Sequence, residues 1–272
     1  MIVSLTHGGL GNRLKNVVSC VKLQRETKLP LKVVWEKTPY VCNCEFNDLF
    51  KNKMKDNVSR GYKLIKYPFK PFTCWRFYVS DKDKIQEKFE YKKDLNGKNL
   101  GGDIYYKNYI DLEYNRIPDN IKFEYIDIFK SLKLIDTLKD KINKFSKKYF
   151  DDDTISVHIR SWSYGFSLEN ERSKHVKIDN FIKEMKKYKN NKFFLATDDK
   201  KIIIQLYKIF KERLMVYNRN MENDRNTKEG IQNDLIDLYL LSKNKVFIGS
   251  RVSTFTEVAW FLGGCTKNII II

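Results

Sequence analysis

In the second half of the chain, short apolar runs alternate with segments whose apolar residues recur at helical spacing. The apolar runs predict strands at 154–160, 193–197, 214–217, 246–249 and 269–272. The segments between these runs predict helices near 177–189, 199–212, 228–243 and 254–262. Regular alternation of this kind is typical of an α/β fold with a doubly wound parallel sheet, in which ligands bind where the strands end.

The first residues of the chain predict a second unit of the same kind. Residues 2–6 form a short apolar strand, glycines interrupt it, and a helix with one apolar face follows. Residues 31–35 predict the next strand, and a crossover helix makes the two strands parallel. Residues 40–130 are rich in aromatic side chains and are expected to form short strands and irregular segments, before a lysine-rich helical stretch at 131–148. We therefore predict two domains, at residues 1–130 and 131–272.

The chain carries a formal charge of +18, from 52 Lys and Arg against 34 Asp and Glu. Such an excess favours anionic partners such as phosphates, nucleic acids or a membrane surface. The basic residues are spread along the whole chain without a known nucleic-acid-binding motif, so we interpret most of them as solvated surface. We expect no nucleic-acid partner, and nucleic-acid binding, with aromatic residues stacking on bases, is the alternative from another functional class.

The N-terminal residues and the cysteines set expectations about location and metal binding. The N-terminus lacks the basic and apolar regions of a signal peptide, and no apolar run approaches the roughly 20 residues of a membrane span. We expect a cytoplasmic protein without a membrane span. The five cysteines have no zinc-site spacing, so we expect reduced thiols and no metal, with a site at Cys42 or Cys44 as a minor alternative.

A glycine-rich turn joins the first predicted strand to its helix. Gly9 and Gly11 allow a ligand to approach the backbone, and the helix N-terminus offers free N–H groups. Asn12 and Arg13 add polar groups that suit a phosphate or sugar hydroxyls. His7 opens the turn and is a candidate general base, with a histidine packed against the backbone as an equal alternative. A turn without a binding role is the alternative for the whole segment.

Two strands of the second half end in charged residues. Strand alternation places His158 and Arg160 on the same face, and an arginine at a strand end can form two hydrogen bonds to a diphosphate. The alternative is a structural ion pair for Arg160 and a core position for His158. After the next strand come Asp198 and Asp199, of which one is expected to cap the following helix. Asp198 is equally able to accept hydrogen bonds from a base or ribose.

Residues 249–257 start at the end of a predicted strand, contain several hydroxyl side chains and lead into the last predicted helix. The candidate binding residues of this hydroxyl-rich segment are Ser253, Thr254 and Phe255. Hydroxyl and backbone N–H groups at a helix start can cradle a phosphate. Thr254 and Glu257 also have the spacing of a capping box. The two roles are compatible, because a capped helix start still has donors to spare.

These four segments, in this order, resemble the fucosyltransferase superfamily that includes the α-1,2-, α-1,6- and protein O-fucosyltransferases and the nodulation fucosyltransferase. Its members share a glycine loop ending in Gly-Asn-Arg, a strand ending in His-x-Arg, a strand ending in Thr-Asp and a late Ser-Thr-Phe segment. The resemblance covers the start of the chain and most of residues 154–265. It implies a GT-B architecture, with two Rossmann-like domains and the donor in the cleft between them. Residues 1–130 would form the acceptor side, and residues 131–272 would bind the nucleotide sugar.

The resemblance also implies an activity, the inverting transfer of L-fucose from GDP-fucose to a glycan hydroxyl without a metal or cofactor. Arg160 would neutralise the β-phosphate as the leaving group departs, and Asp198 would lie near the ribose or base. Asn12 and Arg13 would reach the phosphate or the sugar. The residues expected to hold the diphosphate are Ser253, Thr254 and Phe255. The catalytic candidates are Arg160, His158 and His7.

One departure from the family pattern concerns the donor. The family often has His-x-Arg-x-x-Asp, and this chain has Ser163 at the last place. That aspartate normally supports the surroundings of the arginine, so its absence leaves a rhamnose, xylose or other nucleotide-sugar donor open. A UDP sugar, or a catalytically inactive relative that binds carbohydrate, are further alternatives.

Overall fold

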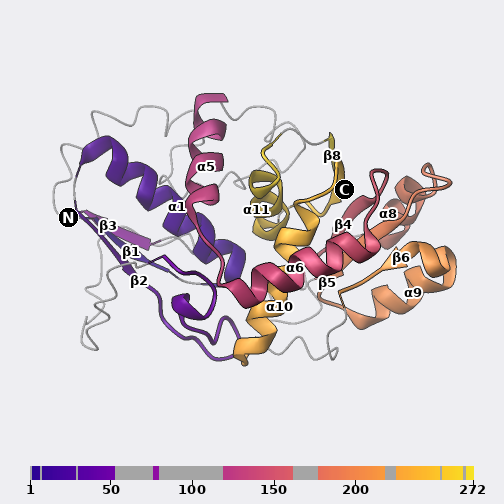
Figure 1. The fold of residues 1–272 in the computed structure, drawn as a ribbon, viewed down its shortest axis with the longest axis horizontal. Coiled ribbons are helices and arrows are strands. Elements are labelled where there is room, and N and C mark those ends of the chain that lie inside the picture. Colours follow the sequence, from indigo (N-terminus) through magenta and orange to yellow (C-terminus); the bar gives the residue numbers. More distant parts are fainter. Residues whose placement is uncertain are drawn as a thin grey trace. The chain divides into compact units, whose positions relative to one another are not determined.

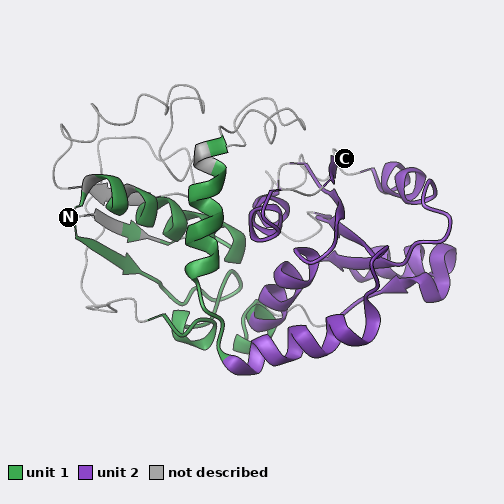
Figure 2. Ribbon diagram, turned by 45° about the horizontal axis from the view of Figure 1, so that its top comes forward, with its two compact units in different colours: residues 1–109, 113–135, 225–231 green, residues 110–112, 136–224, 232–272 purple. Residues whose placement is uncertain are grey.

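The computed structural model describes residues 2–6, 8–28, 30–52, 76–79, 119–161, 177–217, 225–251, 253–265 and 268–272. The chain divides into two compact units (Figure 2). Their residues are 1–109, 113–135 and 225–231 for unit 1, and 110–112, 136–224 and 232–272 for unit 2. That the chain has two independent domains, divided between residues 130 and 131, stays a prediction.

Unit 1 contains a three-stranded sheet in the order β2-β1-β3 (Figure 1). Strand β1 (Ile2–Leu5) pairs in parallel with β2 (Leu31–Val34), because helix α1 (Leu10–Thr27) returns the chain to the same end of the sheet. The predicted strand, glycine turn, helix and strand are thereby confirmed. Strand β3 (Arg76–Val79) pairs with β1 antiparallel and belongs to the region whose strand order was not predicted.

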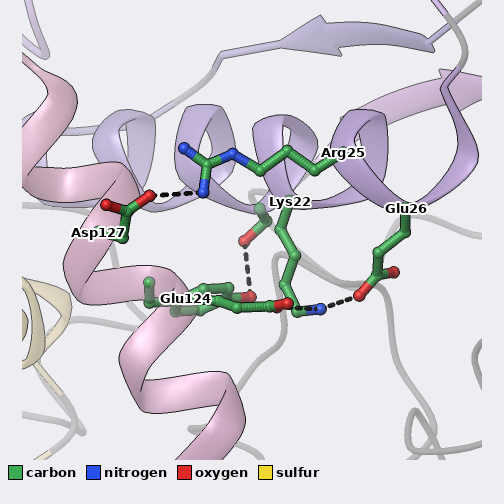
Figure 3. Close-up of polar contacts among 7 residues, drawn as sticks. Lys22, Arg25, Glu26, Glu124 and Asp127 are labelled. Atoms are coloured by element: carbon green, nitrogen blue, oxygen red, sulfur yellow. Dashed lines mark hydrogen bonds and ion pairs between the residues drawn. The ribbon is translucent and has the colours of Figure 1, made fainter.

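Helix α1 packs against helix α5 (Asp119–Ser131) in unit 1. Lys22 of α1 forms ion pairs with Glu26 and Glu124, and Arg25 forms an exposed ion pair with Asp127 at 2.6 Å (Figure 3). The 3-10 helix η1 (Phe46–Asp48) follows β2. The apolar residues Leu14, Val17 and Val18 of the first helix are buried as predicted, but the predicted division into one apolar and one exposed face is wrong, because the polar residues between them, Lys15, Asn16 and Ser19, are buried as well.

Unit 2 contains a five-stranded sheet in the order β6-β5-β4-β7-β8, in which every pair of neighbours is parallel. Its strands are β4 (Ile155–Ile159), β5 (Phe193–Thr197), β6 (Leu214–Met215), β7 (Val246–Gly249) and β8 (Asn268–Ile271). The chain starts in the centre at β4, builds outward to β6, and then crosses to the other side of β4 for β7 and β8. This order confirms the predicted doubly wound parallel sheet.

Helices cover both faces of this sheet. They are α6 (Asp136–Tyr149), α8 (Ile178–Met185), α9 (Lys200–Phe210), α10 (Lys228–Leu241) and α11 (Thr254–Leu262), and the short 3-10 helix η2 (Lys211–Arg213) precedes β6. On one face, alternate residues of β4 pack with apolar residues of α8 and α9, including Phe181 and Leu206. On the other face, Ser156 donates a hydrogen bond to the carbonyl of Leu241 in α10, and Phe194 contacts Phe145 of α6.

The predicted start of the helical stretch at 131–148 is wrong. The structure has two helices there, α5 ending at Ser131 and α6 starting at Asp136. The residues between them are held in an extended backbone by residues 49–52. The N–H of Ile135 donates to the carbonyl of Leu49, and the N–H of Lys51 donates to that of Lys133. Partners distant in sequence therefore interrupt a segment whose own residues favour a helix.

In the described part of the chain, no helix combines the length and the apolar character that crossing a bilayer requires.

Candidate functional site

Polar residues lie just beyond the ends of three neighbouring strands in unit 2. The pairing register aligns the last residues of β4, β5 and β7 to within one position. Since the strands are parallel, the residues that follow them meet at one edge of the sheet. These residues are Arg160, Asp198 and Ser250. The expectation that the polar clusters lie at strand ends is therefore confirmed for this edge.

Arg160 and Asp198 form an ion pair at this edge. The Nη1 group of Arg160 donates to Oδ2 of Asp198, and the backbone N–H of Ser161 donates to Oδ1 of Asp198 at 2.7 Å. The side chains of Arg160 and Asp198 are only 13% and 12% exposed. The carboxylate of Asp198 therefore holds both the guanidinium and the backbone that follows it. The roles of Arg160 and Asp198 toward a donor stay predictions.

Asp199 caps helix α9, because its Oδ1 accepts a hydrogen bond from the backbone N–H of Lys201 at 2.8 Å. The expectation that one of the two aspartates is a helix cap is thus confirmed, and Asp198 is left to pair with Arg160.

Ser250 joins the ends of β4 and β7. Its side chain is fully buried, and its Oγ accepts a hydrogen bond from the backbone N–H of Arg160 at 2.9 Å. Its own backbone N–H donates to the carbonyl of His158 at 3.0 Å. Ser250 therefore fixes the backbone of Arg160 where the sheet pairing ends. The sequence placed Ser250 in the hydroxyl-rich segment after this strand but gave no separate role to it, and the contact with Arg160 depends on strand pairing.

His158 connects β4 to helix α11. Its side chain is buried, its Nδ1 lies 2.7 Å from Oγ1 of Thr256, and its ring stacks on Phe255 with centroids 4.9 Å apart. The pKa of His158 is lowered to about 3, mainly because the side chain is buried; the charge of Asp198 opposes this shift and the charge of Arg160 adds to it. The imidazole is therefore neutral near pH 7. The sequence included Thr256 in the hydroxyl-rich segment, and its contact with His158 was not predicted.

Helix α11 begins next to this histidine. Ser253 is its N-cap residue and is buried, and the hydroxyl of Ser253 makes no capping hydrogen bond within the described residues. The capping box expected from Thr254 and Glu257 is wrong, because the helix starts one residue too early for that pair. Instead, the backbone N–H of Glu257 makes a helical hydrogen bond to the carbonyl of Ser253. Contact of Ser253, Thr254 and Phe255 with a diphosphate stays a prediction.

Gly249 allows α11 to approach β7 closely. A β-carbon at this position would lie 2.3 Å from Cγ2 of Thr256, a distance that real β-carbons do not show. A glycine is thus required where strand and helix meet.

The glycine turn in unit 1 is shaped by Gly8 and Gly9. Gly8 has a φ of +76°, in the left-handed region that favours glycine, and a β-carbon there would lie 2.7 Å from Nδ2 of Asn12. Gly9 is the N-cap of α1, and a β-carbon on it would meet no atom of the described residues within 4 Å. Gly11 is buried in the first turn of α1. Binding of a donor or acceptor by this turn stays a prediction.

Arg13 has a structural role that the sequence did not reveal. Its side chain is fully buried and donates hydrogen bonds to the carbonyls of Gly8 and Glu36 and to Oγ1 of Thr38. The guanidinium also lies 5.3 Å from the ring centroid of Trp35. Burial lowers the pKa of Arg13, while the neighbouring cysteines and Glu36 oppose that shift. Arg13 therefore ties the glycine turn to the chain after β2, and its predicted contact with a donor stays a prediction.

His7, the candidate base, and Ser163, which replaces the aspartate of the family pattern, lie outside the described residues. Cys42 and Cys44 are buried, and a hydrogen bond between their side chains, together with burial, raises the pKa of Cys44. Within the described ranges, no group of three or more His, Cys, Asp or Glu side chains is placed to hold a metal ion.

No family model matches this chain, and no curated protein matches it in sequence. Solved structures do match. NodZ α-1,6-fucosyltransferase, soaked with GDP-fucose, is 18% identical over 96% of this chain and 91% of that chain, with a TM-score of 0.56. POFUT1 in its apo form is 12% identical over 99% of this chain and 97% of that chain, with a TM-score of 0.55. A point mutant of Arabidopsis thaliana FUT1, in complex with GDP, is 14% identical over 99% of this chain and 69% of that chain, with a TM-score of 0.54.

At these identities the likeness concerns the fold. Each of the three structures is aligned along nearly the whole of this chain. The order of motifs in the sequence had indicated the same group of proteins. This chain therefore shares its mixed α/β, GT-B-like fold with these three solved structures.

Proposed function

We propose that this chain is a glycosyltransferase that moves L-fucose from GDP-fucose to a hydroxyl group of a glycan. The observation that supports this proposal most is the meeting of Arg160, Asp198 and Ser250 at one sheet edge of unit 2. It occurs in a fold shared with fucosyltransferases whose solved structures include complexes with GDP and a crystal soaked with GDP-fucose.

The donor diphosphate would bind between Arg160 and the start of α11. The first turn of α11 supplies backbone N–H groups and the positive end of a helix dipole, and both favour a phosphate. The hydroxyls of Ser253 and Thr254 add donors at the same place. Phe255, in the first turn of α11, stacks on the ring of His158 in β4, and this contact holds the start of the helix against the sheet.

The reaction would be a single displacement with inversion. The acceptor hydroxyl forms a bond to the anomeric carbon, the bond from that carbon to the β-phosphate oxygen breaks, and GDP leaves with both bonding electrons. Negative charge then grows on the β-phosphate, where Arg160 stabilises it. In this proposal the guanidinium and the helix dipole supply the positive charge, and no metal takes part.

We assign His158 a structural part in this reaction instead of proton transfer. Its pKa of about 3 makes it a poor base near pH 7, and its Nδ1 faces Thr256. In this proposal, the base that accepts the proton of the acceptor hydroxyl is His7 or another residue of the acceptor side. That side would be residues 1–130, with Asn12 and Arg13 near the phosphate or sugar.

The donor class is tested by thermal shift with GDP, UDP and ADP, followed by transfer assays with the matching nucleotide sugars. A nucleotide present at about 100 times its Kd stabilises the folded state by about 2.7 kcal/mol, which raises the Tm by several degrees. Stabilisation by GDP and release of GDP from GDP-fucose are expected.

Other outcomes of this screen would contradict the proposal. Stabilisation by UDP alone would overturn the fucose donor, and turnover of a rhamnose or xylose donor would replace it. If no nucleotide shifts the Tm and RNA instead gives a salt-dependent gel shift, the nucleic-acid alternative would hold.

A further inference from the structure

We propose that Asp198 is a positioning residue, which holds the guanidinium of Arg160 in the orientation that meets the donor diphosphate and does not itself contact the donor. This inference deepens the proposed function and rests on it for the identity of the ligand. It replaces the ribose or base contact that the sequence suggested for Asp198.

Arg160 is fixed at both ends. Its backbone N–H donates to Oγ of Ser250 at 2.9 Å, and its Nη1 donates to Oδ2 of Asp198. An arginine side chain otherwise samples several staggered rotamers about each of its rotatable bonds. The contact with Asp198 therefore selects the one arrangement in which the guanidinium lies at the edge shared by β4 and β5.

Both carboxylate oxygens of Asp198 bind groups of the protein. Oδ2 pairs with Arg160, and Oδ1 accepts from the backbone N–H of Ser161 at 2.7 Å. The side chain is only 12% exposed. This carboxylate thus binds both the guanidinium of Arg160 and the backbone N–H of the next residue. These contacts position Arg160 and occupy the two oxygens that a ligand would otherwise use.

A guanidinium can serve a carboxylate and a phosphate at the same time. It presents five N–H donors in a rigid planar fork, so a carboxylate can bind one edge while a phosphate binds another. The carboxylate lowers the net positive charge of the site, and this cost is offset by the orientation that it imposes. Pre-ordering raises the fraction of molecules competent to bind, and the apparent affinity rises in proportion.

The test is a double-mutant cycle on GDP affinity, measured by calorimetry with Asp198→Asn, Arg160→Ala and both together. The amide keeps an oxygen for the N–H of Ser161 and loses the charge that attracts Arg160. Asp198→Asn alone should weaken GDP binding about tenfold, because the competent fraction of Arg160 falls. In the Arg160→Ala background it should have no further effect, since residues that act through one another are not additive.

A direct contact with the ribose would give the opposite pattern. Asp198→Asn would then weaken GDP binding by the same factor with or without Arg160, and it would weaken GMP as much as GDP. Either result overturns the positioning role. Asp199→Asn is the matched control, because asparagine keeps the cap of α9, and it should change GDP affinity less than about twofold.

A second measurement needs no nucleotide. In the ligand-free chain labelled with ¹⁵N-arginine, restricted rotation of the Arg160 guanidinium should give separate Nη resonances, which merge in Asp198→Asn. Merged resonances in the wild type, or separate ones in the variant, would contradict the inference. If the wild type binds no GDP, the donor proposal fails, and the NMR result still decides the role of Asp198.

Discussion

Gly249 and Thr256 touch so closely that the missing β-carbon of one leaves space for the γ-methyl of the other. A β-carbon on Gly249 would lie 2.3 Å from Cγ2 of Thr256, and Oγ1 of the same threonine lies 2.7 Å from Nδ1 of His158. The strand end, the helix start and the buried histidine are therefore packed as one group. This group, together with Arg13 and Arg160, can be tested by substitution.

Gly249→Ala should destabilise unit 2 and weaken donor binding together. The added methyl pushes Thr256 and the start of α11 away from the sheet, and overpacking of this kind costs about 1–3 kcal/mol. Thermal unfolding measures the stability, and GDP titration measures the binding.

The rescue variant distinguishes this clash from a general loss of stability. Thr256→Ser removes the γ-methyl and keeps the hydroxyl that contacts His158. The pair Gly249→Ala with Thr256→Ser should recover most of the Tm, whereas an equally low Tm in the double variant would show that the contact is not the cause.

Stability should fall on acidification because of His158. Its pKa is near 6.5 in the unfolded chain and about 3 in the folded chain, so between these values the unfolded state binds one more proton. The free energy of unfolding then falls as the pH falls, by up to about 1.4 kcal/mol per pH unit. His158→Asn, whose amide replaces Nδ1, should remove this slope.

Urea unfolding of the wild type and of His158→Asn, between about pH 7 and pH 4.5, measures the two slopes. Other titrating groups contribute equally to both proteins, so the difference belongs to His158. Parallel slopes would mean that folding does not lower the pKa of His158.

Arg13→Lys should destabilise unit 1 even though the charge is kept. A lysine cannot reach the carbonyls of Gly8 and Glu36 and the hydroxyl of Thr38 at once. Each buried acceptor left without a donor costs about 1–3 kcal/mol. Hydrogen exchange should rise in residues 8–13 and 36–38.

Arg25→Lys on the same helix is the control. Its ion pair with Asp127 is exposed on both sides, at 45% and 68%, so the change should be within about 0.5 kcal/mol. Equal effects of the two substitutions would contradict the structural role of Arg13.

Arg160→Ala should lower transfer at least about 100-fold while the fold stays intact, because the leaving phosphate loses its main positive charge. Arg160→Lys should recover only part of the rate, since it lacks the planar fork. Initial rates of GDP release measure the effect, and circular dichroism verifies the fold. Near-normal turnover by the alanine variant would exclude Arg160 from the reaction.

The sequence predicted unit 2 well because the inner strands β4 and β5 are short, mostly apolar runs that are buried along their whole length. The strands at 193–197 and 246–249 and the helix at 254–262 have the predicted bounds. Local patterns suffice there, since each run has the length and composition of its element. They failed at residues 132–135, where backbone pairing with residues 49–52 decides the conformation.

The candidate site was predictable in its residues and only partly in their partners. Strand alternation put His158 and Arg160 on one face, and the register of the sheet put Asp198 beside them. That Asp198 pairs with Arg160 while Asp199 caps a helix depends on side-chain geometry that sequence spacing does not contain. The burial of Arg13 by the chain after β2 was not predictable, because the neighbours of Arg13 in the sequence do not show it.

The central position of β4 in its sheet determines the order in which this sheet can form during translation. Ile155 pairs with Phe193 on one side and with Val246 on the other. During synthesis β4 therefore leaves the ribosome long before its second neighbour exists, and pairing across such a separation is slow. Arg160 receives its contact with Ser250 only after residues 246–250 have been made. Under the proposed function, the chain can therefore hold a donor only after β7 has been translated, and nascent chains that stop before β7 lack the edge on which the candidate site is built.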